Sequence, residues 1–87
     1  MDTGNIGYHL ANIVKQPAGS AGKIREEIEE FEDALVQGCR LMAVQELSDV
    51  IGAIRLWLES EGIGLTLDDL VIMSNITRRV FENGVRT

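Results

Sequence analysis

Two pairs of carboxylates, each pair three residues apart, are the side chains best suited to chemistry in this sequence. Glu27 and Glu30 lie in the stretch KIREEIEEFEDAL, and Glu46 and Asp49 lie in ELSDVIGAI. Residues three apart on a helix leave it from nearly the same face. Two antiparallel helices would therefore bring four hard oxygen ligands together, a set that suits Mg²⁺ with its waters and substrate phosphates. We expect a Mg²⁺ site here, with Mn²⁺ as an alternative cation.

The first of the two helices that must hold these acids is amphipathic. Its apolar residues recur at spacings of four, three and four, which gives one apolar stripe: Ile24, Ile28, Phe31 and Leu35. Glu27 and Glu30 run along the edge of that stripe. Four other charged residues lie away from it and are expected to form a solvated face: Arg25, Glu29, Glu32 and Asp33. An acidic helical surface without a ligand is the alternative explanation for this segment.

The second helix, residues 41–58, is apolar nearly all round and is expected to be buried between neighbours. Glu46 and Asp49 project into one of its apolar sides, where an unpaired carboxylate is costly or becomes protonated. They therefore need a cation, and a metal ion is the simplest one. Ion pairs with Lys23, Arg78 or Arg79 are the alternative. The link at residues 37–40 is short enough to make the two helices antiparallel neighbours.

The pattern EEIEE followed by ELSD resembles the EExxE…ExxD signature of the all-α NTP pyrophosphohydrolases. That superfamily includes MazG-like proteins, dimeric dUTPases and phosphoribosyl-ATP pyrophosphohydrolases. The residues that carry the resemblance are Glu26, Glu27, Glu30, Glu46 and Asp49, and it covers residues 23–86. It implies an α-helical bundle, Mg²⁺, and hydrolysis of a nucleoside triphosphate to the monophosphate and pyrophosphate.

The mechanism we expect is metal-assisted hydrolysis between the α and β phosphates. Mg²⁺ held by the four carboxylates would neutralise and orient the triphosphate and activate a water. The general base would be one of the carboxylates, with Glu27 as a candidate, or Glu26 just outside the metal ligands.

Candidates for contact with the substrate lie in several segments. Lys23, one turn before Glu27, is placed to steer a phosphate or to form a salt bridge with Glu27 or Glu30. The resemblance implies phosphate contacts near the C-terminal end of the domain, where the basic and amide candidates are Asn75, Arg78 and Arg79. The alternative is that these residues only complement a helix C-terminus.

The aromatic candidates are His9 and Trp57. His9 is the single histidine, and it is a candidate for contact with the base or a phosphate, although a lone histidine more often has a packing or surface role. Trp57 is a candidate for stacking on the base, with a core or interface position as the alternative. Gly52 indicates either a close helix crossing or room for substrate.

The chain length of 87 residues allows one domain, residues 1–87, with a core too small to be very stable alone. We expect an all-α antiparallel bundle of about four helices. The first is short, on the pattern of residues 6–14, and the last covers residues 67–81. Ser20 and Thr66 are the expected N-caps, and Gly38 and Gly84 the expected stops. Because 45% of the residues are hydrophobic, a homodimer or dimer of dimers is expected to complete the fold.

Charge and cysteine content narrow the function further. The net charge of −6 argues against general nucleic-acid binding, so polyphosphate must be bound through metal. The single cysteine, Cys39, excludes an internal disulfide and, with no apolar run of membrane-spanning length, favours a cytoplasmic protein. We therefore expect a nucleotide pyrophosphohydrolase that removes unwanted nucleoside triphosphates. The alternatives are a phosphoribosyl-ATP pyrophosphohydrolase-like enzyme and a non-enzymatic helical interaction module.

Overall fold

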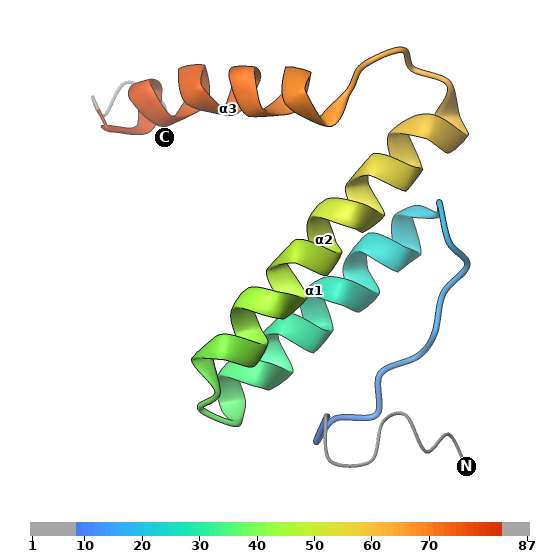
Figure 1. Ribbon diagram of the computed structural model, residues 1–87, viewed down its shortest axis with the longest axis vertical. Helices are drawn as coiled ribbons and strands as arrows, with labels where there is room; N and C mark the ends of the chain where they lie inside the picture. Colours follow the sequence, from blue (N-terminus) through green and yellow to red (C-terminus); the bar gives the residue numbers. More distant parts are fainter. Residues whose placement is uncertain (1–8, 83–87) are drawn as a thin grey trace.

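The computed structural model describes the backbone of residues 9–82 and the side chains of residues 9–78, and within this part the chain forms three helices and no strand (Figure 1). Helix α1 spans Ala21–Val36, α2 spans Arg40–Glu61 and α3 spans Leu67–Glu82. The all-α class is therefore confirmed for the described residues. None of their helices combines the length and the apolar character needed to cross a membrane.

The segment before α1, residues 9–20, contains no helix and is called the strap here. It runs along the side of α1 (Figure 1). The helix expected over residues 6–14 is therefore wrong for residues 9–14, and residues 6–8 lie outside the described part. The apolar pattern in this segment is short, and three of its backbone amides donate to side chains of α1 instead of to a helical turn, namely those of Leu10, Ala11 and Gln16.

The ends of the helices follow local sequence signals. Ser20 caps α1, its hydroxyl oxygen accepting from the Lys23 amide at 3.1 Å. After α1, Gly38 takes the left-handed region at φ +76°, where a side chain would be strained. Thr66 and Asp69 form a reciprocal cap at the start of α3: the Asp69 amide donates to Thr66 Oγ1 at 3.2 Å, and the Thr66 amide donates to Asp69 Oδ2 at 2.8 Å. The stop expected at Gly84 lies outside the described residues.

Helices α1 and α2 lie side by side and antiparallel, as the short link requires (Figure 1). The apolar residues buried within the described chain are Ala34, Ala43, Ala53 and Leu58. Three of these four are alanines, which allow close approach but bury little apolar area. The described part of one chain therefore has a very small hydrophobic core.

The outer side of α2 is uncovered in one chain, so the described residues of a single chain do not supply the neighbours between which this helix is expected to be buried. Val44, Leu47 and Ile51 are all exposed, and so are Ile28 and Leu35 of the apolar stripe on α1. The apolar pattern of α2 is that of a helix with neighbours on several sides. In one chain, however, the side of α2 away from α1 is left exposed.

Helix α3 leaves the far end of α2 and lies away from α1 (Figure 1). Its apolar side chains are largely exposed, among them Val71, Ile72, Met73 and Ile76. The radius of gyration is 15.3 Å, compared with about 12 Å for a compact domain of this length. The described residues of one chain thus form an open three-helix arrangement and not a four-helix bundle.

Candidate metal centre

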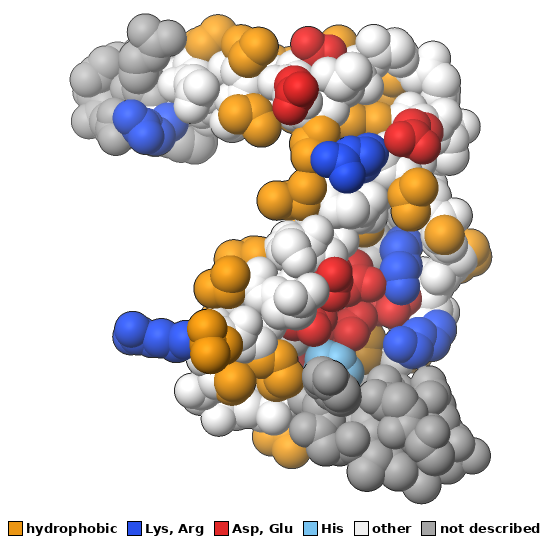
Figure 2. Space-filling model, viewed as in Figure 1, with side chains coloured by type: hydrophobic (Ala, Val, Ile, Leu, Met, Phe, Trp, Pro, Cys, Tyr) orange, Lys and Arg blue, Asp and Glu red, His pale blue; other side chains and the backbone are white. Residues whose placement is uncertain are grey.

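The side of α1 that faces the rest of the chain is acidic. The charged residues buried in the described part are Glu26, Glu27, Glu30, Asp33 and Glu46. Figure 2 shows the acidic side chains gathered over the middle of α1 and α2, with the single histidine directly beside them. The expectation that Asp33 belongs to a solvated face is wrong, because the strap covers it.

The carboxylates expected to bind metal are brought together between α1 and α2. Glu27, Glu46 and Asp49 each offer an oxygen within 4.8 Å of the others, and Glu30 forms a similar group with Glu46 and His9. Glu30 also groups with Glu26 and Glu27. We call Glu26, Glu27, Glu30, Glu46 and Asp49 the acidic cluster. Glu46 belongs to two of its groups and lies at their junction.

Burial and mutual repulsion disfavour the charged form of two members of the cluster. Burial, with the neighbouring charges of Glu27 and Glu46, raises the pKa of Glu30 to about 7. Burial and the charge of Asp49 likewise raise the pKa of Glu46. Oxygen Oε2 of Glu46 is buried and has no hydrogen-bond partner among the described residues. The cluster therefore lacks positive charge.

Part of the cluster is neutralised by Lys23, which confirms one of the ion pairs considered from the sequence. Its Nζ lies 2.9 Å from Glu26 Oε2 and 3.0 Å from Glu27 Oε1. Burial alone would raise the pKa of Glu26, but hydrogen bonds from Lys23 and from the Gln16 amide lower it overall. Glu26 is thus engaged by protein donors on both oxygens.

Two buried acids of α1 hold the strap in place. Oxygens Oδ2 and Oδ1 of Asp33 accept from the amides of Leu10 and Ala11, each at 2.9 Å, and Glu26 Oε1 accepts from the Gln16 amide at 2.6 Å. Burial would raise the pKa of Asp33, but these amides and the Gln37 side chain lower it overall. A signal for this role exists in the sequence, because one polar row follows the helical period: Glu26, Glu30, Asp33 and Gln37.

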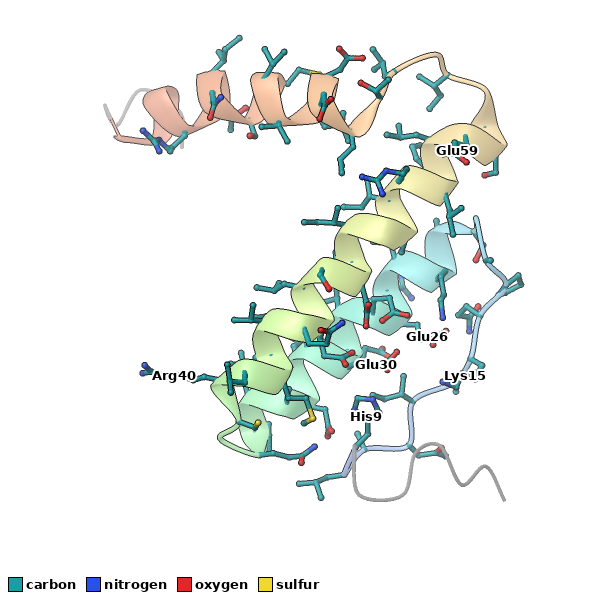
Figure 3. The ribbon with its side chains drawn as sticks, in the orientation of Figure 1. His9, Lys15, Glu26, Glu30, Arg40 and Glu59 are labelled. Carbon is teal, nitrogen blue, oxygen red and sulfur yellow. The ribbon has the colours of Figure 1, made fainter. Side chains whose placement is uncertain are left out.

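His9 reaches from the strap into the acidic cluster (Figure 3). Its Nε2 lies 2.8 Å from Glu30 Oε1, and its Nδ1 lies 3.3 Å from Asp33 Oδ2. The side chain is only 7% exposed. In this arrangement His9 faces carboxylates, and the base or phosphate contact expected of it stays a prediction.

The remaining substrate candidates do not meet the cluster within the described part of one chain. Trp57 is half-buried on α2, while Asn75 and Arg78 are exposed on α3, which contacts α2 but not α1 among the described residues. The side chain of Arg79 lies outside the described part. The candidates that do contact the acidic cluster are Lys23 and His9.

The donor set of the cluster fits a hard divalent cation. Carboxylate oxygens are the ligands that Mg²⁺ and Mn²⁺ prefer, and the buried Glu46 oxygen lacks a partner that a cation would supply. Comparison of the chain with protein-family models, with curated proteins and with solved structures found no match in any of the three.

Proposed function

We propose that this protein is a Mg²⁺-dependent nucleoside triphosphate pyrophosphohydrolase that releases pyrophosphate and a nucleoside monophosphate. The observation that carries the proposal is the position of Glu46. It is buried, its Oε2 has no hydrogen-bond partner among the described residues, and it shares one group of close ligand atoms with Glu27 and Asp49 and another with Glu30 and His9. Such an acid is stabilised by a cation, and the motif resembles that of a superfamily in which the cation is Mg²⁺.

In this proposal the cation is held by Glu27, Glu30, Glu46 and Asp49. A bound Mg²⁺ supplies charge neutralisation of the polyphosphate and a more acidic bound water. Glu27 is our choice as general base, because both oxygens of Glu26 are engaged by protein donors, whereas Glu27 pairs with Lys23 through Oε1.

Two further features beside the cluster support a polyphosphate substrate. Lys23 is the cation nearest to Glu27 among the described residues, and about a quarter of its side chain is exposed, so it is placed to exchange a carboxylate for a phosphate oxygen. Gly52, one turn beyond Asp49, has open space where a Cβ would project. Within the described part of one chain no other helix approaches Gly52 closely, so the space there is open either to substrate or to a helix of a second copy.

We further propose that the active species is a homodimer or a dimer of dimers. A second copy would cover the exposed row on α2 formed by Val44, Leu47 and Ile51, and it would give α3 a partner. In such an assembly Asn75 and Arg78 could reach an acidic cluster that they do not approach in one chain. The role we propose is the removal of unwanted nucleotides in the cytoplasm, with phosphoribosyl-ATP as the alternative substrate.

The decisive experiment is a panel of ribo- and deoxyribonucleoside triphosphates with Mg²⁺, with the products resolved. We expect monophosphate and pyrophosphate from wild type. Glu46→Gln should lose at least about 100-fold of the rate, because it removes charge from the cation site. It should also raise the stability of the metal-free fold, because the buried charge is unpaired. The control is Glu32→Gln on the exposed side of α1, which should leave both the rate and the stability unchanged.

The outcomes separate the candidate functions. Diphosphate and orthophosphate as products would contradict cleavage between the α and β phosphates. Hydrolysis by Glu46→Gln at the wild-type rate would contradict the site. If neither triphosphates nor phosphoribosyl-ATP react, the protein is better described as a helical interaction module, in which Lys23 pairs with the acids of α1 for structural reasons.

A further inference from the structure

The strap supplies the acidic cluster with one nitrogen donor. His9 Nε2, Glu30 and Glu46 form a group whose ligand atoms all lie within 4.8 Å of one another. Three segments contribute to this group, namely the strap, α1 and α2. It differs in chemistry from the all-carboxylate group of Glu27, Glu46 and Asp49, because an imidazole nitrogen replaces one oxygen.

The imidazole ring is held in the orientation of a metal ligand. Nδ1 of His9 faces Asp33 Oδ2 at 3.3 Å, and Asp33 is itself fixed by the amides of Leu10 and Ala11. A carboxylate on one ring nitrogen orients the ring and directs the other nitrogen toward the metal, which is the usual outer-shell arrangement around metal-binding histidines. The second nitrogen, Nε2, points at Glu30.

A second observation indicates that a cation belongs in this group. Glu46 is 5% exposed, and its Oε2 is buried without a hydrogen-bond partner among the described residues. Between Nε2 of His9 and Oε1 of Glu30, 2.8 Å apart, a shared proton must lie, since both atoms are otherwise acceptors. Two ligands about 2.1 Å from one Zn²⁺ ion at the tetrahedral angle are about 3.4 Å apart, so these two atoms must separate by about half an ångström to admit the ion. A divalent ion can therefore take the place of that proton and serve Glu46 at the same time.

We propose that His9, Glu30 and Glu46 form a second cation site that takes a divalent transition-metal ion, with Zn²⁺ as the probe, in preference to Mg²⁺. Imidazole suits Zn²⁺ and its neighbours in the first transition series, whereas Mg²⁺ prefers oxygen ligands and water. The inference rests on the proposed function only in treating Glu30 and Glu46 as ligands. It does not require that the protein hydrolyse nucleotides. A filled site would also tie the strap to both helices.

The test uses the full chain without a histidine tag, in a Cys39→Ser background that removes the only thiol. The chain has one histidine, so every imidazole ¹⁵N signal comes from His9. We expect Zn²⁺ to shift the Nε2 signal strongly at saturation and Mg²⁺ to shift it little. Titration calorimetry should show that His9→Gln weakens Zn²⁺ binding by at least about tenfold. Even the loss of a residue that only hydrogen-bonds to a metal ligand lowers metal affinity by about 10–100-fold. It should weaken Mg²⁺ binding by less than about threefold.

The control is Asn12→Ser, a change at an exposed and uncharged residue of the same strap, and this variant should bind Zn²⁺ as tightly as the parent. An Nε2 signal that does not respond to saturating Zn²⁺ overturns the inference even if His9→Gln fails to fold, because that measurement uses the native histidine. Equal Zn²⁺ affinity of His9→Gln and the parent also overturns it. Mg²⁺-dependent hydrolysis without a His9-dependent Zn²⁺ site removes this inference and leaves the proposed function. A His9-dependent Zn²⁺ site without hydrolysis supports the inference and removes the proposed function.

Discussion

Nε2 of His9 lies 2.8 Å from Oε1 of Glu30, so that the non-helical strap and helix α1 meet inside the acidic cluster. The same strap is held by Asp33 near its start, at Leu10, and by Glu26 at Gln16. The cluster is therefore bounded by α2 on one side and by an irregular segment on the other. The carboxylates of α1 therefore fall into two groups. Asp33 and Glu26 accept hydrogen bonds from backbone amides of the strap, whereas burial and neighbouring negative charges raise the pKa of Glu30.

The first prediction concerns the pH dependence of stability in the absence of metal. The pKa of Glu30 is about 7 in the fold against 4.5 ordinarily, and that of Glu46 is also raised. Both groups bind protons more tightly when folded, so their contribution to stability is complete below pH 4.5 and is lost as the pH rises through about 7. Urea unfolding in EDTA should give a higher free energy of unfolding at about pH 5 than at about pH 8.

Two comparisons check the cause of this pH dependence. Glu30→Gln should reduce the difference between the two pH values, because the variant has no proton to release. At still lower pH the trend should reverse, since the pKa values of Glu26 and Asp33 are lowered and their stabilisation is lost as the pH falls through those values. A wild-type protein that is equally stable at both pH values would contradict the description of the cluster.

The second prediction concerns divalent cations. Cations that bind the folded protein and not the unfolded chain raise the free energy of unfolding by mass action. The rise is about 1.4 kcal/mol when the free cation concentration is ten times the dissociation constant. For a domain of this size that corresponds to a rise in Tm of roughly 6–11 °C. Scanning calorimetry with millimolar MgCl₂ or MnCl₂ should show the rise, and NaCl at the same ionic strength should not. A rise that NaCl reproduces would indicate screening of charge and not a site.

The third prediction tests Asp33 as the acceptor that holds the strap. Asp33→Asn replaces one carboxylate oxygen by a donor that would face the amide of Leu10 or Ala11. Leaving a buried donor unpaired costs about 1–3 kcal/mol, and the amide protons of both residues should exchange faster with solvent. Glu32→Gln changes the neighbouring, exposed acid and should alter neither quantity. Unchanged exchange at Leu10 and Ala11 would count against the strap contacts.

The fourth prediction compares two glycines, Gly52 and Gly38, that both have open space where a Cβ would project. Gly52 lies within α2, so Gly52→Ala should stabilise the fold by about 0.5–1 kcal/mol. Gly38 has φ +76°, so Gly38→Ala should destabilise it. If the space beside Gly52 is for substrate, Gly52→Ala should also slow hydrolysis, which Gly38→Ala should not do beyond its effect on folding. Urea unfolding and the nucleotide assay measure the two effects separately.

Helices α1 and α2 and the all-α class of the described residues could be predicted from the sequence because their signals are local. Ser20, Gly38 and Thr66 end or begin helices for reasons contained in a few neighbouring residues. The spacing of the acids also predicts that Glu27 and Glu46 approach each other once the link is short. Helical period and turn chemistry are enough for these conclusions.

The burial of Asp33 and Glu26 could not be predicted in the same way. A helical pattern gives the direction in which a side chain points, but not which other segment covers that direction. The covering segment is the strap, whose weak apolar spacing predicts a helix that does not form, and its amides need acceptors that α1 supplies. The uncovered side of α2 has a related cause, because apolar periodicity does not say whether the partner belongs to the same chain.

The fifth prediction concerns the uncovered row on α2. Light scattering should give a mass at least twice the chain mass of 9.6 kDa. A double variant, Val44→Asp with Ile51→Asp, should dissociate the assembly, because it places charges in a surface that we expect to be buried. Gln45→Asp, on the same helix but outside the row, should leave the mass unchanged. A wild-type mass near 9.6 kDa at micromolar concentration would contradict the proposed oligomer.

The exposure of α3 has a consequence for how a lone copy opens. Val71, Ile72, Met73 and Ile76 bury little area within the chain, and a helix of 16 residues is near the length at which isolated helices become marginal in water. The opening of α3 is thus governed by its own propensity and by the Thr66–Asp69 cap, whereas α1, α2 and the strap open together. A single chain accordingly contains one cooperative unit, formed by α1, α2 and the strap, and one helix, α3, that unfolds separately. Helix α3 is therefore the place where a protease or a chaperone would first engage a single copy.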